Sequence, residues 1–431
     1  MSSTVIRSVS PAVTLESEAS PLDSSLKRRL RRTTRRHRLR AFALTLPLLA
    51  FILLFFALPL VDMMARSFYD PRVANTLPET VAVLEDWEFE GLPPEAAYAA
   101  VTREILERQE DGSLGSLALQ LNHEIAGART LLLRTAKGLE ETPSPAVGSS
   151  YQELLTSIHR QWGEQDFWST LKIMGNSFTL RHYLAAFDQR YDANGEIVAR
   201  PDYEQVHVML FGRTLWASAL IVVLTLLLGF PIAYHIANSP PKVGNLLLIL
   251  VLLPFWTALL VRTAAWIVLL QQQGVLNDLL VALGLVADEA RLRMMHNMTG
   301  TIVAMTHIML PFMVLPLYSV MKSIPPVHMR AAASLGAPPF LAFIRVYLPQ
   351  TKPGIAAGCI LVFILCIGYY ITPALVGGRT GQFISSFVAY HIQQSLNWGL
   401  AAALSGVILV TVLLLYTLYS RLFGGDSIRL G

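Results

Sequence analysis

Six apolar runs, each of about 20 residues or more, alternate with polar stretches along the chain. They cover residues 41–62, 208–236, 245–270, 299–321, 354–376 and 398–420. A helix needs about 20 consecutive apolar residues to cross the hydrocarbon core of a bilayer. The pattern therefore predicts an all-α polytopic membrane protein with six transmembrane helices. Charged residues make up only 15% of the chain, below the roughly 25% of soluble domains, which agrees with this class.

The polar segment 66–205 separates the first span from the other five and is too long for a structureless loop. Apolar residues recur every three to four positions in its middle, which indicates helices. These positions are Leu114, Leu117, Leu121, Ile125, Ala128 and Leu132, and then Tyr151, Leu154, Leu155, Ile158 and Trp162. We expect a mainly helical external domain. Its excess of Asp and Glu is either an ordinary solvated surface or an attraction for a cationic partner or substrate.

Lysine and arginine residues set the orientation of the spans. A basic stretch at 27–40 precedes the first span, and no small-residue cleavage site follows that span. Positive residues favour the cytoplasmic side, so both termini are expected in the cytoplasm and segment 66–205 in the periplasm. The predicted parts are a disordered basic tail (1–40), a first transmembrane helix (41–65), the external domain (66–205), a five-helix core (206–421) with a cytoplasmic loop (323–353), and a second cytoplasmic tail (422–431).

The loop 323–353 is predicted to form two short helices. The pairs Pro325-Pro326 and Pro338-Pro339 suit helix starts, and Gly336 suits the left-handed position that ends a helix. Pro349 and the pair Pro353-Gly354 are expected to stop the second helix before the next span. Four apolar residues share one face of that helix: Phe340, Phe343, Ile344 and Tyr347. Such a stripe must be buried, either on the protein's own spans or on a soluble partner.

Arg330-Ala331-Ala332, Gly336 and Val346-x-Leu348-Pro349 stand at a spacing that resembles the "EAA" loop of permease subunits in binding-protein-dependent ABC importers. The resemblance implies that this loop couples the membrane helices to a separate ATP-hydrolysing subunit. One position departs from the pattern, because Arg330 stands where the family usually has Glu. The coupling residues implied are Arg330, Ala331, Ala332, Gly336, Ala337, Phe340, Phe343, Val346, Leu348 and Pro349.

Four further segments look like the spermidine/putrescine-type branch of that family: 229–234, 254–262, 310–318 and 371–378. The resemblance covers roughly residues 40–68 and 178–425, and residues 72–176 look like an addition that short members lack. It implies ATP-binding subunits, a second permease subunit in a heterodimer, and a periplasmic substrate-binding protein as partners, with membrane lipid but no nucleic acid. It implies no catalytic residue, metal or cofactor on this chain, since ATP and Mg would bind to the partner ATPase.

The residues themselves favour an external source of energy. The spans carry almost no Asp or Glu, whereas ion-coupled secondary transporters usually use intramembrane carboxylates. The chain also lacks a G-x-x-x-x-G-K-[ST] phosphate loop, so ATP is expected on another chain and this chain is not an enzyme.

Candidate pathway residues lie near expected helix interruptions, where transporter sites often form. Pro311 and Pro316 in one span, and Gly368 with Pro373 in the next, are expected to kink their helices. Arg262 either snorkels to the headgroups or belongs to an external gate. Neighbouring aromatic rings either hold an alkylammonium group or pack in the bundle. The candidates are Arg262, Trp256, Tyr369, Tyr370, Thr372 and Pro373.

The sequence thus predicts the permease subunit of an ATP-driven importer in the cell inner (cytoplasmic) membrane. Its expected cargo is a small solute delivered by a substrate-binding protein, a polyamine or a related small amine. Opines, amino acids and phosphonates stay open as cargo. An ion-coupled secondary transporter is the alternative mechanism.

Overall fold

The computed structural model describes residues 42–145 and 149–423. The predicted tail 1–40 and most of the predicted tail 422–431 lie outside these residues. The chain divides into two compact units, Met1–Asp62 and Met63–Gly431. An apolar helix of 24 residues, Phe42–Ala65, confirms the first predicted span. It contains a π-helical turn, η1 (Leu53–Ala57), followed by α2 (Leu58–Ala65).

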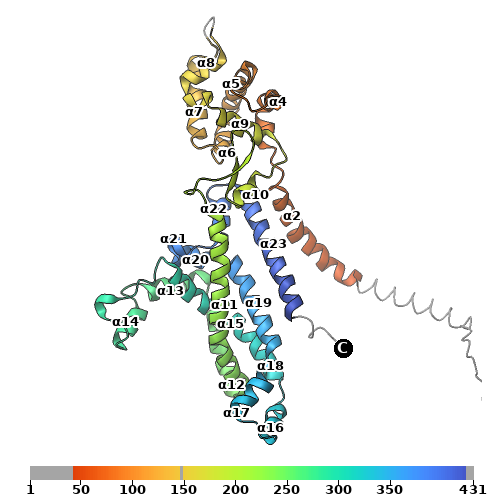
Figure 1. Ribbon diagram of the computed structural model, residues 1–431, viewed down its shortest axis with the longest axis vertical. Coiled ribbons are helices and arrows are strands. Elements are labelled where there is room, and N and C mark those ends of the chain that lie inside the picture. Colours follow the sequence, from red (N-terminus) through yellow and green to blue (C-terminus); the bar gives the residue numbers. More distant parts are fainter. Residues whose placement is uncertain (1–41, 146–148, 424–431) are drawn as a thin grey trace, which may run out of the picture. The chain divides into compact units, whose positions relative to one another are not determined.

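Segment 66–205 forms the expected mainly helical domain (Figure 1). Its helices are α3 (Arg72–Thr76), α4 (Pro78–Glu85), α5 (Glu95–Glu110), α6 (Leu114–Leu121), α7 (Ala128–Glu141), α8 (Tyr151–Ile158), η2 (Arg160–Gly163), α9 (Gln165–Gly175) and α10 (Arg181–Ala186). A short antiparallel hairpin follows, in which β1 (Gln189–Tyr191) pairs with β2 (Ile197–Ala199). The sequence did not lead us to expect this hairpin.

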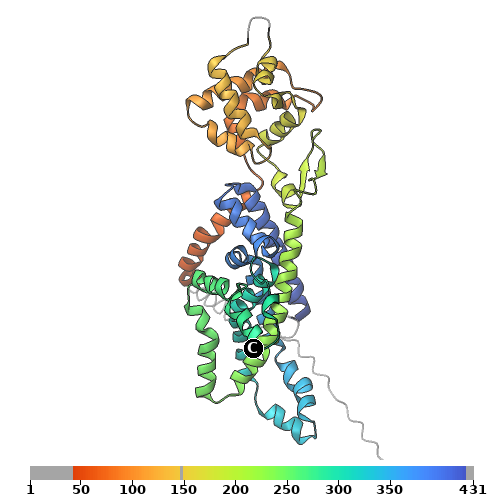
Figure 2. The same cartoon turned by 90° about the vertical axis from the view of Figure 1, so that its left-hand side faces the viewer.

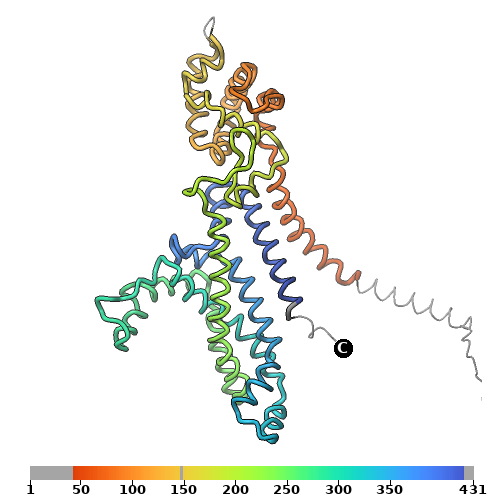
Figure 3. Tube along the Cα trace, in the orientation of Figure 1, coloured from red at the N-terminus to blue at the C-terminus, as the bar shows by residue number. Residues whose placement is uncertain are grey.

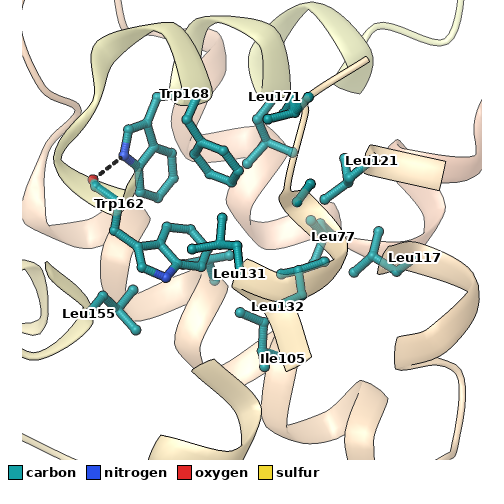
Figure 4. Packing of buried hydrophobic residues seen from close by; sticks show 14 of the residues in the cluster. Leu77, Ile105, Leu117, Leu121, Leu131, Leu132, Leu155, Trp162, Trp168 and Leu171 are labelled. Atoms are coloured by element: carbon teal, nitrogen blue, oxygen red, sulfur yellow. Dashed lines mark hydrogen bonds between the residues drawn. The ribbon is translucent and has the colours of Figure 1, made fainter. Parts of the chain in front are cut away.

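The core of this external domain is centred on Trp162 and Trp168, both fully buried (Figure 4). The indole N–H of Trp168 donates to the carbonyl of Trp162 at 2.8 Å, and the indole N–H of Trp162 donates to Thr135 Oγ1 at 2.8 Å. The apolar positions predicted between Leu114 and Leu132 are all buried. They lie on two helices and, for Ile125, on the turn between them, because Gly127 adopts a left-handed φ of 84° just before α7.

The two ends of this domain meet side by side. The N–H of Asp70 donates to the carbonyl of Ser177 at 2.8 Å, and the N–H of Thr179 donates to the carbonyl of Phe68 at 2.8 Å. The buried carboxylate of Asp70 also accepts hydrogen bonds from Arg72 at 2.7 Å and from Arg181. An antiparallel bridge with an ion-pair cluster therefore closes the domain at its base.

The external domain also caps the first helix of the membrane core, α11 (His207–Asn238). Asp188, just before β1, accepts hydrogen bonds from the N–H groups of His207 at 3.0 Å and Val208 at 2.8 Å. N–H groups in the first turn of a helix have no partner inside the helix, so the carboxylate of Asp188 supplies one. Its negative charge also lies at the positive end of the helix dipole, which stabilises α11. Figure 3 shows α11 running from this cap to the far end of the bundle.

The membrane core contains the remaining helices. They are α12 (Pro241–Leu252), η3 (Leu253–Trp256), α13 (Leu259–Leu270), α14 (Val275–Ala282), η4 (Asp288–Ala290), α15 (Met298–Ser323), α16 (Val327–Ser334), α17 (Pro339–Ala342), η5 (Phe343–Tyr347), α18 (Leu348–Gln350), α19 (Lys352–Gly368), α20 (Ile371–Val376), α21 (Gly378–Gly381), α22 (Ile384–Gln393) and α23 (Trp398–Phe423).

Helices α11, α15 and α19 form the centre of this core. Met309, Met313 and Val314 of α15 are buried between the other two. Gly358 of α19 lies so close to Met313 that a Cβ at this position would stand 2.7 Å from its sulfur. Lipid supplies no hydrophobic driving force for the association of membrane helices, so their association depends on close packing. Small residues such as Gly358 permit this close packing.

Two of the predicted spans are not single helices. The run 245–270 is broken at Thr257 and Ala258, both extended, because Pro254 and the tight turn η3 end α12. The run 354–376 is broken at Tyr369 and Tyr370, between α19 and α20. Prolines do not break α15, which is continuous through Pro311 and Pro316. The described residues contain five helices long and apolar enough to cross a membrane, or six if the bent pair Pro339–Gln350 and Lys352–Gly368 counts as one.

Candidate functional site

The segment between α15 and α19 forms the predicted pair of short helices (Figure 2). Helix α16 begins after Pro326 and ends at Gly336, whose φ is +84°. The N–H of Gly336 donates to the carbonyl of Ala333, and the N–H of Ala337 donates to that of Ala332, both at 3.0 Å. These are the two bonds of a Schellman motif, so Gly336 ends the first helix as predicted. We call residues 327–350 the hairpin.

The second helix of the hairpin runs from Pro339 to Gln350 through α17, η5 and α18, so it ends between Pro349 and Pro353, as predicted. The helix includes Pro349 itself because of the π-helical turn η5, in which the N–H of Leu348 bonds to the carbonyl of Phe343. This wider turn admits Pro349, which has no N–H to place in the helix. The helix then bends by 60° at Thr351 into α19.

The aromatic stripe of the second helix is divided between two environments. The ring of Phe343 stacks on Tyr347 at 5.6 Å and meets Phe230 and Tyr234 of α11 edge-on at 6.2 and 5.7 Å. By contrast, the side chain of Phe340 is 76% exposed. The stripe thus packs on the protein's own spans at one end and is free at the other.

The free end of the hairpin is apolar and cationic. Leu335, next to Gly336, is 88% exposed, and Arg330 is also exposed. Segment 322–353 contains Lys322, Arg330, Arg345 and Lys352 but no Asp or Glu. None of the ion pairs formed among the described residues includes these four cations.

Arg262 lies beside the first helix break. Its guanidinium donates to the freed carbonyl of Thr257 at 3.1 Å and lies 6.0 Å from the ring centre of Phe255. The candidate Trp256, at the end of η3, is 75% exposed and does not join this contact. Arg262 therefore satisfies a backbone group that the break leaves open, as irregular backbone at membrane depth requires.

The second helix break is satisfied by serines of α22. The carbonyl of Tyr369 accepts a hydrogen bond from Ser385 at 2.8 Å, and that of Tyr370 accepts one from Ser386 at 3.4 Å. One turn on, the hydroxyls of Thr372 and Thr263 are 3.0 Å apart, and both residues are fully buried. Thr263 belongs to α13, the helix that follows the first break, and Thr372 belongs to α20, which follows the second break. This contact therefore links the two helices that follow the breaks. Pro373, beside Thr372, is buried.

Three cavities open in the described part of the membrane core, of which one is lined almost entirely by apolar residues of α11, α19 and α23 and two border the helix breaks or the prolines. Of the latter two, one of about 350 Å³ borders the second break and is lined by Tyr370, Ser385, Gln393 and Ser405 among others. The other, of about 550 Å³, lies between α11, α12 and α15 and includes His235 and His307. None of the six candidate pathway residues lines the second cavity. Its sequence signal was the set of prolines at 231, 254 and 311, which loosen the packing of three neighbouring helices.

Comparison with known proteins identifies the class of this membrane core. The family model described as "Binding-protein-dependent transport system inner membrane component" matches residues 225–423. The chain is 34% identical over 223 residues to the spermidine/putrescine transport system permease protein PotB of Haemophilus influenzae, which covers 51% of this chain and 77% of that protein. The chain belongs to this family of permeases.

Further matches cover similar shares of the chain. The chain is 36% identical over 204 residues to PotB of Escherichia coli, covering 47% of this chain and 74% of that protein. It is 33% identical over 227 residues to the inner membrane ABC transporter permease protein YdcU of Escherichia coli, covering 50% and 72%. Among solved structures, a bacterial ABC transporter that imports alginate matches with 22% identity and a TM-score of 0.41, covering 50% of this chain and 79% of that chain.

The matched region of the permease contains the hairpin, both helix breaks and the cavities of about 350 and 550 Å³. The external domain at 66–205 lies entirely before it. The parts that the sequence assigned to coupling and to the pathway therefore lie within the region that the family model matches.

Proposed function

We propose that this permease is the membrane subunit of an ATP-driven importer and that its cargo is a polyamine or a related small amine. The cargo is supported by the PotB relatives, which are permease proteins of spermidine/putrescine transport systems. An alkylammonium chain also suits the cavity at the second break, where the phenol of Tyr370 and the oxygen atoms of Ser385 and Gln393 meet. A cation over an aromatic face gains about 0.5–2 kcal/mol.

The observation that carries the mechanism is the division of the hairpin. Phe343 and Tyr347 hold it against α11, while Leu335 and Phe340 stay exposed at its other end. In the proposed mechanism, ATP and Mg bind to separate ATPase subunits, which receive this exposed end from the cytoplasm. Movement of the hairpin passes to α11 through Phe343 and to α19 through the bend at Thr351.

The proposed assembly also contains a second permease subunit and a periplasmic binding protein, with both termini of this chain in the cytoplasm. Substrate enters from the external side, where Arg262 and the second break lie on the proposed pathway. Alternating access then results from tilting of α11 and α19 around the buried contact between Thr263 and Thr372.

Uptake into proteoliposomes that contain the whole assembly tests this function. We expect the uptake of radiolabelled spermidine or putrescine to require ATP and the binding protein, and to persist when an ionophore collapses the ion gradients. Uptake driven by an ion gradient without ATP would establish the ion-coupled alternative. Competition by an unlabelled opine, amino acid or phosphonate, stronger than by unlabelled polyamine, would refute the cargo alone.

A hairpin variant separates coupling from folding. Leu335→Asp places a charge on the exposed end and should abolish ATP-dependent uptake while the purified protein keeps its thermal unfolding midpoint. Leu133→Asp, at an exposed leucine of the external domain, is the matched control and should leave uptake unchanged. If both variants transport normally, the hairpin is not the coupling element.

A further inference from the structure

We propose that the hairpin docks in an ATPase cleft with an apolar floor and a rim of carboxylates, so that the ionic contact at Arg330 places the positive charge on the permease. This inference rests on the proposed function and adds the chemistry of the partner. It also accounts for the departure at Arg330, where the sequence pattern would place Glu.

The first step is the charge of the hairpin itself. The hairpin contains Arg330 and Arg345, its flanking residues add Lys322 and Lys352, and segment 322–353 has no carboxylate. Lys322 donates a hydrogen bond to the carbonyl of Ala237 at 3.2 Å, and His328 binds Gln350 at 2.7 Å between Nδ1 and Oε1. These contacts involve neutral acceptors, so the hairpin does not neutralise its own charge.

The second step is that the membrane core has no carboxylate to offer. In the described part of the core, residues 206–423, the acidic residues are Asp278, Asp288 and Glu289. Asp278 and Asp288 already bind Arg291, each at 2.7 Å. The acidic external domain caps α11 at His207, whereas the hairpin packs against Phe230 and Tyr234 of the same helix, about 35–40 Å along its axis. No ion pair among the described residues includes Arg330, so its exposed guanidinium is available to a carboxylate of the ATPase.

The third step distinguishes a protein cleft from a lipid surface. A helix that lies on a membrane presents a long continuous apolar face with cations beside it. Here α16 has eight residues, and its exposed surface includes the small Ala331 and Ala333. Leu335 and Phe340 form a compact projection at the turn between the two helices. Small residues permit close approach of another backbone, and the planar guanidinium of Arg330 can bind a carboxylate with two hydrogen bonds.

Charge variants at Arg330 test the inference in the complete complex. We expect the Kd for the ATPase to rise about tenfold in Arg330→Gln and further in Arg330→Glu, because a carboxylate then faces carboxylates. The wild-type complex should weaken as salt rises, and Arg330→Gln should show a shallower salt dependence. Arg330→Lys keeps the charge but not the two parallel hydrogen bonds, so its affinity should lie between that of wild type and that of Arg330→Gln. A Kd for Arg330→Glu equal to or lower than that of wild type would overturn the proposal.

A cross-linking experiment identifies the partner group. A carbodiimide joins an amine to a carboxylate in contact with it, so Arg330→Lys should become linked to an Asp or Glu of the ATPase, as mass spectrometry would show. Leu335 replaced by a photoreactive phenylalanine analogue reports docking independently of charge. A photo-cross-link at 335 without a carbodiimide cross-link at 330 refutes the acidic rim but leaves the coupling function intact. Loss of both refutes the docking itself.

A lipid arm uses the same variants. The permease is placed in bilayers of neutral phosphatidylcholine or of phosphatidylcholine with about one-third phosphatidylglycerol, an anionic lipid. We expect the effect of Arg330→Glu on ATPase binding to be the same in both. An effect confined to the anionic bilayers would show that the cations of the hairpin face lipid, and would overturn the proposal.

Discussion

Removal of the Phe343 ring should loosen the hairpin from α11, whereas removal of the Phe340 ring should not. Phe343 makes three ring contacts, with Tyr347, Phe230 and Tyr234. Each aromatic pair contributes about 0.5–1.5 kcal/mol beyond the area it buries. Because Phe343 is only half-buried and the contacts are not additive, we take about 2 kcal/mol for Phe343→Ala.

A local loss of about 2 kcal/mol raises the population of the open hairpin about 30-fold, since 1.4 kcal/mol corresponds to a factor of ten. Hydrogen–deuterium exchange of the amides in η5 and α18 measures this opening directly. We expect exchange to accelerate by about that factor in Phe343→Ala and to stay unchanged in Phe340→Ala. ATP-dependent uptake should fall in both variants. In Phe343→Ala, movement of the hairpin no longer passes to α11, and in Phe340→Ala, the exposed end of the hairpin docks less well on the ATPase. Equal exchange in both variants would refute the division of the stripe.

Three further predictions concern backbone and charge. Gly336→Ala should lower the stability of the hairpin by about 1 kcal/mol and accelerate amide exchange at the end of α16, because Gly336 has a φ of +84°. Gly115→Ala is the control: Gly115 lies inside α6 with open space around it, so this variant should not be destabilised. His391 is a pH-sensitive site: burial, His207 and His123 lower its pKa from 6.5 to about 4, so the unfolded chain binds the extra proton. Thermal stability should therefore fall as the pH drops from about 6.5 to about 4, and this slope should flatten in His391→Gln. Burial alone would raise the pKa of Asp70, but His182, Arg72 and Arg181 outweigh it and hold the pKa below its usual value. The stabilising effect of the Asp70 carboxylate is thus present at neutral pH and is lost as the pH falls below about 4. Asp70→Asn should make the external domain easier to proteolyse at pH 7. The stability of this variant should then fall less than that of wild type when the solution is acidified.

The sequence was sufficient where one local signal decides the structure. Long apolar runs identified the spans, and Gly336 identified the turn of the hairpin because only a residue tolerant of positive φ fits there. The break at Tyr369 lies between Gly368 and Pro373, where an interruption was expected. The break at Thr257 was missed, since the apolar pattern continues through it. The β-hairpin at 189–199 had a signal that we did not use, an Asn-Gly pair between two strand-like segments.

The candidate site was predictable in its residues but not in their partners. Phe340 and Phe343 have the same chemistry and occupy the same stripe, yet only Phe343 meets α11. Which of them packs inward depends on the π-helical turn η5 and on the 60° bend at Thr351, and both arise from tertiary packing. The hydrogen bonds of Ser385 and Ser386 to the second break join residues about 16 positions apart, and no spacing rule anticipates them.

The bridge at Tyr69 and Phe178 bears on how such a protein could have acquired its external domain. Paired antiparallel residues stand only about 5 Å apart, a gap that a turn of two to five residues can close. Excising residues 72–176 and joining the ends with such a turn would leave Asp188 and its cap on α11 in place. A single insertion or deletion event in evolution could thus add or remove more than a hundred residues without rethreading any membrane helix.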